Sequence, residues 1–543
     1  MVPMHRLARL VAIIVVSVLF IPSAPGAQAV VFRLEEATIA DITAAFDAGA
    51  LTCRQLTELY LNRIAAYDKS GPKINSIITI NPRALETATA LDEERRARGP
   101  RSRLHCIPVL LKDNINTFDM PTTNGSVILK DAIPSDDAFI AKALRDAGAM
   151  ILGKASMGEF AGGSYNTVIG QTINPYHLLR NTGGSSSGSG AALAANFAVL
   201  AIGTDTSTSV RGPSSFNGVV GLRPTTGLIS RNGIAPKNLN FDSAGPMART
   251  VTDLAIMLTT IAGPDPADAD GLSMEVFRNH PAAVGMDYTQ FLRRGALRGA
   301  RIGVARAYFG GDPEIDALAE TAIATMKELG VEIVDPVVID PAIVDNVRTI
   351  ADYRFKDDWE KYLATFGPHV PKTVAEFVEI YKTKVARSAL PVESSVMNLL
   401  ERSLVTSTDT PLYRDLMERV LPANTALKRA IFDRYNLDAL VFPYNPTFAS
   451  PISNPAYQLD DPTFVPSKVA APSTLAGYSS TGSPGIVVPM GFGSQGLPMT
   501  ISFMGRPYEE EKIIGYAYDY EQASRLRHPS PLIPPLPGEV ITY

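Results

Sequence analysis

Apolar residues recur along this chain at two alternating spacings. Over residues 34–68 they fall three and four positions apart, which predicts two helices divided near Gly49. Residues 107–115, IPVLLKDNI, form an apolar run that ends in polar residues, which predicts a buried strand leading into a loop. Residues 136–156 and 189–209 each predict a helix followed by a buried strand. This alternation is typical of an α/β protein.

The C-terminal half continues the pattern. Residues 300–336 predict a strand, a helix and another strand. Three short apolar strands follow, at residues 437–443, 485–489 and 499–505. Residues 340–430 are mostly helical in pattern and more charged, and they contain the only tryptophan, Trp359. Because no long linker interrupts the chain, we expect one domain over residues 30–543 with a largely buried mixed sheet.

The first 29 residues have a different character. Arg6 and Arg9 precede an apolar run at residues 10–21, and small residues follow up to Ala29. A basic start, a short apolar core and an A-x-A end are typical of a secretory signal peptide, here residues 1–29 with cleavage after Ala29. The run is short for a spanning helix, so an uncleaved anchor is the lesser alternative. We expect a secreted or periplasmic protein without stable membrane insertion once processed.

Composition and charge narrow the classes of partner. The chain is 45% hydrophobic and 19% charged, which is typical of globular proteins, and its formal net charge is -5. No basic surplus favours a nucleic acid as partner. The six histidines show no metal-ligand spacing such as H-E-x-x-H, so we expect no metal.

Two cysteines are present in a chain expected to be exported. Cys53 lies in a helical pattern, and Cys106 lies beside a strand-like run. A single bridge between them is possible in an oxidising compartment. Small apolar cysteines are often buried as thiols, so we expect two buried free thiols.

The stretch NTGGSSSGSG, residues 181–190, has three interpretations. A flexible linker does not normally run directly into a strong helix and a buried strand, as this stretch does. A phosphate-binding loop requires G-x-x-x-x-G-K-[ST] or a third small residue where Leu193 stands, and both are missing. A nucleophile elbow centred on Ser186 lacks an apolar strand before it. Its histidine base would come from residues in polar or proline-flanked settings: His280, His369 or His528.

Two other stretches place a polar side chain at or just after the end of a predicted strand. Lys112 directly follows the apolar residues 107–111, where the plain alternative is an exposed lysine at a strand end. Ser209 follows a second apolar strand, in a loop rich in small residues. Loops at strand ends are where open α/β sheets usually carry their sites.

Together these stretches resemble the amidase signature family of serine amidohydrolases. The resemblance is carried by PVLLKDNI, AGAMILGKASMGEFA, GGSSSGSGAALAAN, GTDTSTSVRGPSSFNGVVGLRPTTGLIS and SAGPMARTVTDLA, within a signature core at about residues 107–250. C-terminal stretches such as SPGIVVPMG and LPMTISFMGRPYEEEKIIGYAYDYEQAS are also similar to the family. The resemblance implies a central mixed β-sheet covered by helices on both faces, with residues 340–430 as a helical, more variable region.

The resemblance also implies a catalytic triad. By position these residues are Lys112 after PVLL, Ser185 as the first serine of GGSSSGSG, and Ser209 before Val-Arg. Lys112 would be a neutral base, Ser185 would pass protons from a cis peptide at Gly184–Ser185, and Ser209 would be the nucleophile. The family's reaction uses no metal and no cofactor.

The loop before Ser209 departs from the family pattern. Backbone N–H groups of Thr206, Ser207 and Thr208, with that of Ser209, would form the oxyanion hole. Many family members have Gly-Gly where this chain has Ser207-Thr208, so side chains crowd the loop and any positive φ there would be strained.

Further serines and an aspartate accompany the implied triad. Ser187 also replaces a glycine that is common in the other loop. Ser186 and Asp205 are expected to support the site from behind, with ordinary loop capping as the alternative.

These observations predict a hydrolase of small-molecule or peptide amides that works through an acyl-enzyme. Its expected subgroup is the peptide-amidase-like or general amidases. Two alternatives remain open at this point: an amidotransferase-type subunit of the same family, which works in the cytosol with partner subunits, and a catalytically inactive binding protein on the same fold.

Overall fold

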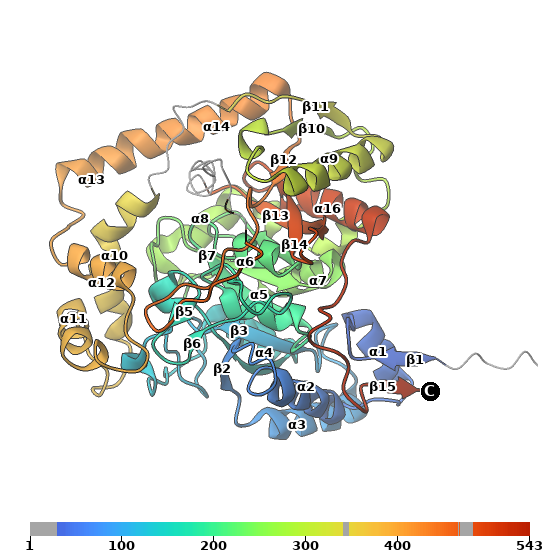
Figure 1. Ribbon diagram of the computed structural model, residues 1–543, viewed down its shortest axis with the longest axis horizontal. Helices are drawn as coiled ribbons and strands as arrows, with labels where there is room; N and C mark the ends of the chain where they lie inside the picture. Colours follow the sequence, from blue (N-terminus) through green and yellow to red (C-terminus); the bar gives the residue numbers. More distant parts are fainter. Residues whose placement is uncertain (1–29, 340–346, 465, 467–481) are drawn as a thin grey trace, which may run out of the picture.

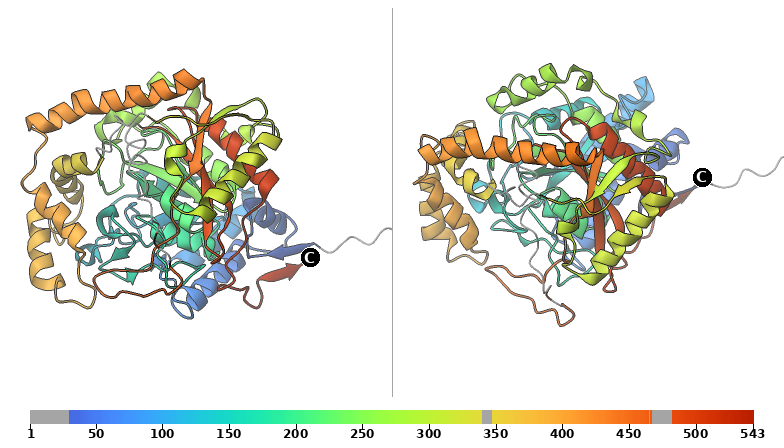
Figure 2. Two further views of the ribbon diagram at one scale, coloured as in Figure 1. Left: turned by 45° about the horizontal axis from the view of Figure 1, so that its top comes forward. Right: turned by 90° about the horizontal axis from the view of Figure 1, so that it is seen from above.

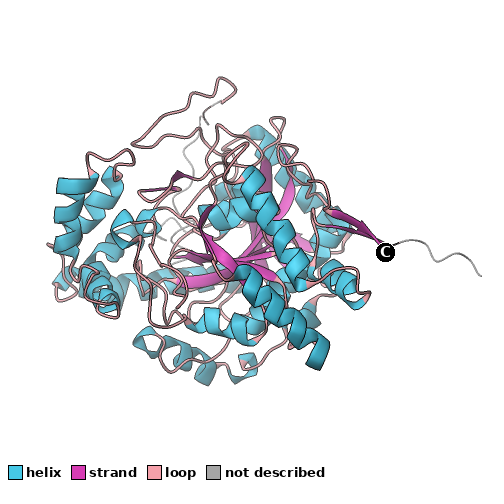
Figure 3. Ribbon diagram, turned by 90° about the horizontal axis from the view of Figure 1, so that it is seen from below, coloured by secondary structure: helices cyan, strands magenta, loops and turns pink. Residues whose placement is uncertain are grey.

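The computed structural model describes residues 30–339, 347–464, 466 and 482–543, so the predicted signal peptide lies outside the described residues. Eleven strands form one mixed sheet in the order β11-β10-β12-β14-β13-β8-β9-β7-β3-β4-β2. Figure 3 draws the strands in magenta among the helices. In that order the strands are Glu332–Val334, Arg301–Val304, Ala439–Pro443, Pro498–Met504, Gly485–Phe492, Val220–Arg223, Ser243–Ala248, Leu200–Asp205, Pro108–Lys112, Met150–Ala155 and Ile77–Ile80. The predicted α/β class with a mixed sheet is confirmed.

Strand direction within the sheet decides where the site lies. β3 pairs in parallel with both β4 and β7, and β10 pairs in parallel with β11 and β12. The remaining pairings are antiparallel. Because β3 and β7 run in parallel as neighbours, their carboxyl ends meet at one edge of the sheet. Lys112 ends β3 and Asp205 ends β7 at that edge.

Helices surround the sheet (Figures 1 and 3). Before the helical region they are α1 Ile39–Asp47, α2 Cys53–Tyr67, α3 Ala84–Arg98, α4 Phe139–Asp146, α5 Ser187–Ala194, α6 Arg211–Phe216, α7 Val251–Ile261, α8 Leu272–Asn279 and α9 Pro313–Glu328. α7, α9 and α16 (Glu510–Ser524) pack on one face, whereas α5 and α6 pack on the other. Short two-stranded sheets join β1 (Val31–Arg33) to β15 (Val540–Thr542) and β5 (Tyr165–Asn166) to β6 (Gly170–Gln171).

The strands that carry the site are apolar and covered on both faces. Every residue of β3, β4 and β7 is buried, as is expected of strands with helices on either side. α5 lies close against this layer: a Cβ atom at Gly203 of β7 would come within 2.6 Å of the Ser186 hydroxyl oxygen. Glycine at position 203 therefore lets the segment that begins α5 approach the strand.

The region predicted to be helical forms a wall beside the sheet. It contains α10 Val347–Leu363, α11 Val374–Ile380, α12 Ser394–Ser403, α13 Pro411–Asp415 and α14 Leu421–Tyr435, and α14 runs back to the sheet (Figures 1 and 2). Phe160 of the signature core packs against the rings of Phe355, Trp359 and Phe377, with ring centroids 6.1, 4.9 and 6.0 Å away. This aromatic cluster fixes the wall to the core.

Among the described residues, no helix combines the length and the apolar character needed to cross a membrane.

The expectation of two free thiols is wrong. Cys53 and Cys106 form a disulfide with a Cα–Cα distance of 5.3 Å. Cys53 is the first residue of α2, and Cys106 stands two residues before β3. Helical and strand patterns describe each cysteine locally, but their pairing depends on how α2 packs beside the start of β3, which is a tertiary contact.

We predict that this disulfide contributes about 4 kcal/mol to the free energy of unfolding, because it closes a loop with a sequence separation of 53. The double variant Cys53→Ala/Cys106→Ala should lower the unfolding midpoint in chemical denaturation by a corresponding amount. Wild-type protein unfolded with a thiol reductant is the matched control and should behave like the variant. An unchanged midpoint in both would show that the bridge contributes nothing.

Candidate active site

Lys112 lies at the centre of the site. Its side chain is fully buried at the end of β3, and its Nζ donates to Ser185 Oγ at 2.7 Å. The same Nζ lies 2.8 Å from Thr204 Oγ1 and 3.2 Å from the Thr204 carbonyl oxygen. Burial lowers the pKa of Lys112 to about 7, although the charges of Asp205 and Asp242 oppose this shift. A substantial fraction of Lys112 is therefore a neutral amine near neutral pH.

Ser185 meets Lys112 from the Gly/Ser stretch. The peptide bond between Gly184 and Ser185 is cis, as the family resemblance implies. A Cβ atom on Gly184 would stand 1.9 Å from the Gly163 carbonyl oxygen, so only glycine fits there. The Ser185 carbonyl accepts from Gly158 N at 3.2 Å. Backbone contacts thus hold the Ser185 hydroxyl against Lys112.

Ser209 lies in the loop that follows β7. Its carbonyl oxygen accepts from the backbone N–H of Ser186 at 3.2 Å, which joins this loop to the Gly/Ser stretch. Ser209 is half-buried, whereas Ser185 is 1% exposed. The structure therefore brings together the three segments that carry Lys112, Ser185 and Ser209.

Ser186 has a supporting position. Its hydroxyl donates to the Thr204 carbonyl and accepts from Thr204 N, both at 3.2 Å, and the side chain is fully buried. Two backbone contacts thus occupy the Oγ of the residue at the centre of Gly-x-Ser-x-Gly. This geometry agrees with support from behind the site and opposes an exposed nucleophile at Ser186.

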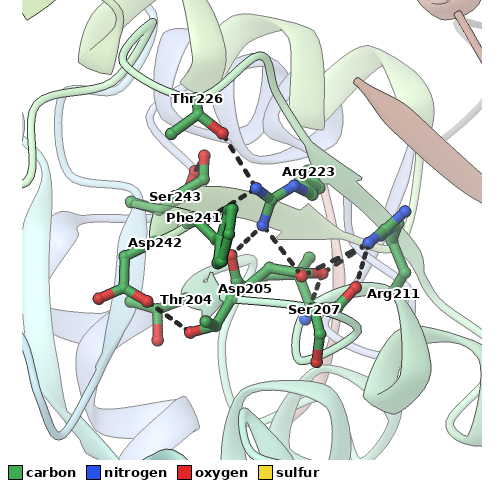
Figure 4. Close-up of polar contacts among 12 residues, drawn as sticks. Thr204, Asp205, Ser207, Arg211, Arg223, Thr226, Phe241, Asp242 and Ser243 are labelled. Carbon is green, nitrogen blue, oxygen red and sulfur yellow. Dashed lines mark hydrogen bonds and ion pairs between the residues drawn. The ribbon is translucent and has the colours of Figure 1, made fainter. Parts of the chain in front are cut away.

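Asp205 anchors the loop through two arginines that converge on it (Figure 4). Its carboxylate oxygens lie 3.2 Å from Arg211 Nε and 3.2 Å from Arg223 Nη1, and Oδ2 accepts from Val210 N at 3.0 Å. Burial by itself would raise the pKa of Asp205, but Arg211 and Arg223 outweigh burial and lower it to about 2. Asp205 is therefore a permanent anion inside the protein.

Further hydrogen bonds hold the loop that was expected to form the oxyanion hole. Arg211 Nη2 donates to the Ser207 carbonyl at 2.6 Å, and Thr206 Oγ1 donates to Asp242 Oδ1 at 2.5 Å. Ser207 and Thr208 do not adopt a positive φ, so the side chains that replace glycines cause no left-handed strain. In the described part of the chain, the backbone N–H groups of Thr208 and Ser209 meet no acceptor.

Several residues of the site escaped the sequence analysis. Asn114 Nδ2 donates to Thr204 Oγ1 at 3.0 Å, so Thr204 connects Asn114, Lys112 and Ser186. Thr204 precedes Asp205 at the end of a predicted strand, and this position could have marked it as a site residue. Arg211 and Arg223 carried no signal of their own, because pairing with Asp205 is visible only in the fold.

Two of the three histidines considered as bases stack on aromatic rings. His280 stacks on Tyr508 and His528 stacks on Phe492, with centroid distances of 3.4 and 3.6 Å. Within the described ranges, one group of potential metal ligands lies close together, formed by His105 and the two cysteines of the disulfide. Neither finding gives Ser186 a histidine partner.

The loop after β3 contacts the helical wall beside the site. Ser126 Oγ and the Tyr381 hydroxyl are 2.5 Å apart, which links the loop after β3 to the helical wall. Tyr381 also hydrogen bonds to the buried carboxyl of Glu159, whose Oε1 accepts from Thr167 Oγ1 at 2.7 Å. Burial raises the pKa of Glu159 to about 8, so this carboxyl is protonated at neutral pH and can donate a hydrogen bond.

Comparisons with known proteins show the family to which the chain belongs. The family model described as Amidase matches residues 55–514. The solved peptide amidase of Stenotrophomonas maltophilia is 37% identical, with a TM-score of 0.81 over 91% of this chain and 98% of that one. A probable amidase of Arabidopsis thaliana is 33% identical over 523 residues, which cover 92% of this chain and 93% of the plant protein.

A relative with a different activity is also similar. A glutamyl-tRNA(Gln) amidotransferase subunit from Caldanaerobacter subterraneus subsp. tengcongensis is 34% identical over 485 residues, or 87% of this chain and 93% of that relative. The family model and the solved amidases support an enzyme that hydrolyses amide bonds. From its sequence, its mixed sheet with flanking helices and these matches, the chain belongs to the amidase family of amidase-signature enzymes.

Proposed function

We propose that the protein hydrolyses linear carboxylic amides with Lys112, Ser185 and Ser209 as its catalytic triad. The observation that carries this proposal is the 2.7 Å contact between Lys112 Nζ and Ser185 Oγ, made by a fully buried lysine. Ser185 lies on the segment that is hydrogen bonded to Ser209 through Ser186. The segments that carry the proposed relay and the proposed nucleophile are thus hydrogen bonded to each other, and the proposed base contacts the relay.

The reaction proceeds in two stages. In the first, Ser209 Oγ attacks the amide carbonyl carbon while its proton passes to Ser185, which gives its own proton to neutral Lys112. The tetrahedral intermediate then breaks its C–N bond, and the leaving amine takes a proton back through Ser185. In the second stage water attacks the acyl-enzyme by the same proton path, which releases a carboxylic acid and restores Ser209.

Backbone donors of the loop would stabilise the oxyanion. The N–H groups of Thr206, Ser207, Thr208 and Ser209 are the proposed donors. Two of them, Thr208 and Ser209, have no acceptor in the described residues and remain available to a substrate. A missing oxyanion-hole donor typically costs about 10²–10³ in kcat. Arg211 and Asp242 hold the loop from behind, which keeps such donors preorganised.

The relatives point to a substrate class. The peptide amidase aligns with 37% identity over nearly its whole length, which supports peptide amides as substrates. Aryl and acyl amides are the other substrates that we propose. The amidotransferase subunit is the competing assignment, supported by its 34% identity. An exported protein would not meet charged transfer RNA, so the proposed signal peptide favours the amidase. An inactive binding protein is disfavoured by a buried lysine whose pKa is about 7.

Export is part of this proposal. Residues 1–29 have the sequence of a secretory signal peptide, and the disulfide between Cys53 and Cys106 is of a kind that persists in oxidising compartments. The mature protein would be secreted or periplasmic.

Ser209 should be the only serine that a fluorophosphonate probe labels, because its activated hydroxyl attacks the electrophilic phosphorus. Peptide mapping by mass spectrometry would locate the adduct. Ser209→Ala should abolish both labelling and amide hydrolysis, whereas Ser186→Ala, the matched control in the opposite loop, should keep the labelled site. Labelling that survives Ser209→Ala would refute the assignment of the nucleophile.

The dependence of kcat/KM on pH should reveal Lys112. Because the base must be neutral and its pKa is about 7, kcat/KM should fall about tenfold for each pH unit below about 7. Lys112→Met should lower kcat/KM by about 10²–10⁴ and remove this acidic limb, while circular dichroism shows a folded protein. A wild-type profile that stays flat down to about pH 5 would contradict a lysine base.

The mature amino terminus should be Val30. Expression of the full chain in a secreting host, followed by intact-mass measurement of the exported protein, should show loss of residues 1–29. A variant with Ala27→Arg and Ala29→Arg should remain uncleaved, because signal peptidases require small residues at these positions. An exported wild-type protein that still begins at Met1 would exclude cleavage.

A further inference from the structure

Lys237 lies on a chain segment that runs beside the loop after β3. The backbone of residues 233–235 is hydrogen bonded to that of residues 114–116, with N···O distances of 2.9 and 2.8 Å. An isolated antiparallel bridge joins the same two stretches. Because residues 114–116 follow Lys112 directly after Asp113, these bonds fix the segment next to the strand end that carries the proposed base.

One small cavity is lined both by Lys237 and by residues that hold the proposed base. Thr204 Oγ1, which lies 2.8 Å from Lys112 Nζ, belongs to a residue of this lining. The cavity volume is about 10 Å³, which gives room for about one water molecule and is too small for a carboxylate. Lys237 and the contacts of the base thus border the same space, and Figure 4 labels two other lining residues, Asp242 and Ser243.

The Lys237 amine forms no hydrogen bond and no ion pair with any described residue. Its Nζ lies 5.7 Å from the centroid of the Phe355 ring, which belongs to α10 of the helical wall. Arg231 is another cation of the cavity lining, but it pairs with Asp268 at 2.8 Å. Lys237 is therefore the cation of this lining that no described carboxylate pairs with.

Two carboxylates act electrostatically on Lys237, and both are bound to other groups. Asp242 accepts from Thr206 Oγ1 at 2.5 Å and from two backbone N–H groups at 2.7 and 2.8 Å. Asp352 of α10 pairs with Arg402 of α12 at 2.8 Å. Burial lowers the pKa of Lys237 to about 8, while Asp242 and Asp352 oppose this shift and Arg402 adds to it. Most Lys237 amines are therefore still protonated at neutral pH.

The charge of Lys237 also acts on Lys112. Burial is the main cause of the lowered pKa of Lys112, Asp205 and Asp242 oppose it, and the charge of Lys237 adds to it. A like charge nearby disfavours the protonated form of an amine. Because the proposed base must be neutral to accept a proton, a positive Lys237 favours the form of Lys112 that the mechanism requires.

We propose that Lys237 is a positioning residue for the amidase reaction, whose positive charge keeps the Lys112 amine in its neutral, basic form. Lys237 acts across the cavity, since the hydrogen bonds of Lys112 go to Ser185 and Thr204. This inference rests on the proposed function, in which Lys112 is the base.

The pH dependence of kcat/KM tests the role of Lys237. Lys237→Met removes the charge, so the acidic limb of the profile should move to higher pH by about half a pH unit or more. Lys237→Arg keeps a positive charge and should keep the limb at its wild-type position. Lys237→Gln is a second neutral variant if Lys237→Met does not fold. Lys356→Met, which removes an amine from α10 next to Phe355, is the matched control and should leave the limb unchanged.

Direct titration of the Lys112 amine separates this inference from the proposed function. In protein labelled with ¹³C at the lysine Cε, the NMR signal of Lys112, assigned by its absence from Lys112→Met, reports protonation without any turnover. Lys237→Met should raise the pH at which this signal titrates, by the same amount as the kinetic limb. A signal that titrates at the wild-type pH in both neutral variants would overturn the role of Lys237. A signal that moves while the kinetic limb stays in place would support the action of Lys237 on Lys112 and refute Lys112 as the base.

Discussion

The buried amine of Lys112 is the constraint on which the site depends. An amine in solution is protonated at neutral pH, and here complete burial opposes the charge. Its bonding partners are hydroxyl and carbonyl oxygens of Ser185 and Thr204, so no carboxylate of the described chain bonds to it directly. A direct carboxylate partner would raise the pKa of the lysine and remove the base. A carboxylate near Lys112 must therefore be paired with other groups.

Asp205 meets that requirement because Arg211 and Arg223 form ion pairs with its carboxylate. It stands one residue after Thr204, and its charge does raise the pKa of Lys112. Arg211 and Arg223 hold both carboxylate oxygens, and the same Arg211 fixes the Ser207 carbonyl. One ion cluster thus limits the influence of Asp205 on the base and sets the shape of the loop before Ser209. This bracing also explains how Ser207 and Thr208 replace glycines without a positive φ.

Local pattern predicted much of this protein, and long-range pairing accounts for what it missed. The strands ending at Lys112 and Asp205 are uninterrupted apolar runs, so their positions and the loops after them were readable. Family motifs then located Ser185 and its cis peptide. The disulfide was missed because Cys53 and Cys106 lie 53 residues apart and each fits its local pattern. The arginine cluster was missed for the same reason, since charged residues in a sequence do not reveal their partners.

The ion cluster of Asp205, Arg211 and Arg223 acts on the pKa of two buried lysines. Toward Lys112 it presents the carboxylate, whose charge raises the pKa of that lysine. Toward Lys428 it presents Arg211 and Arg223, whose charges lower the pKa of that lysine. Different members of one ion cluster therefore act on the two buried amines.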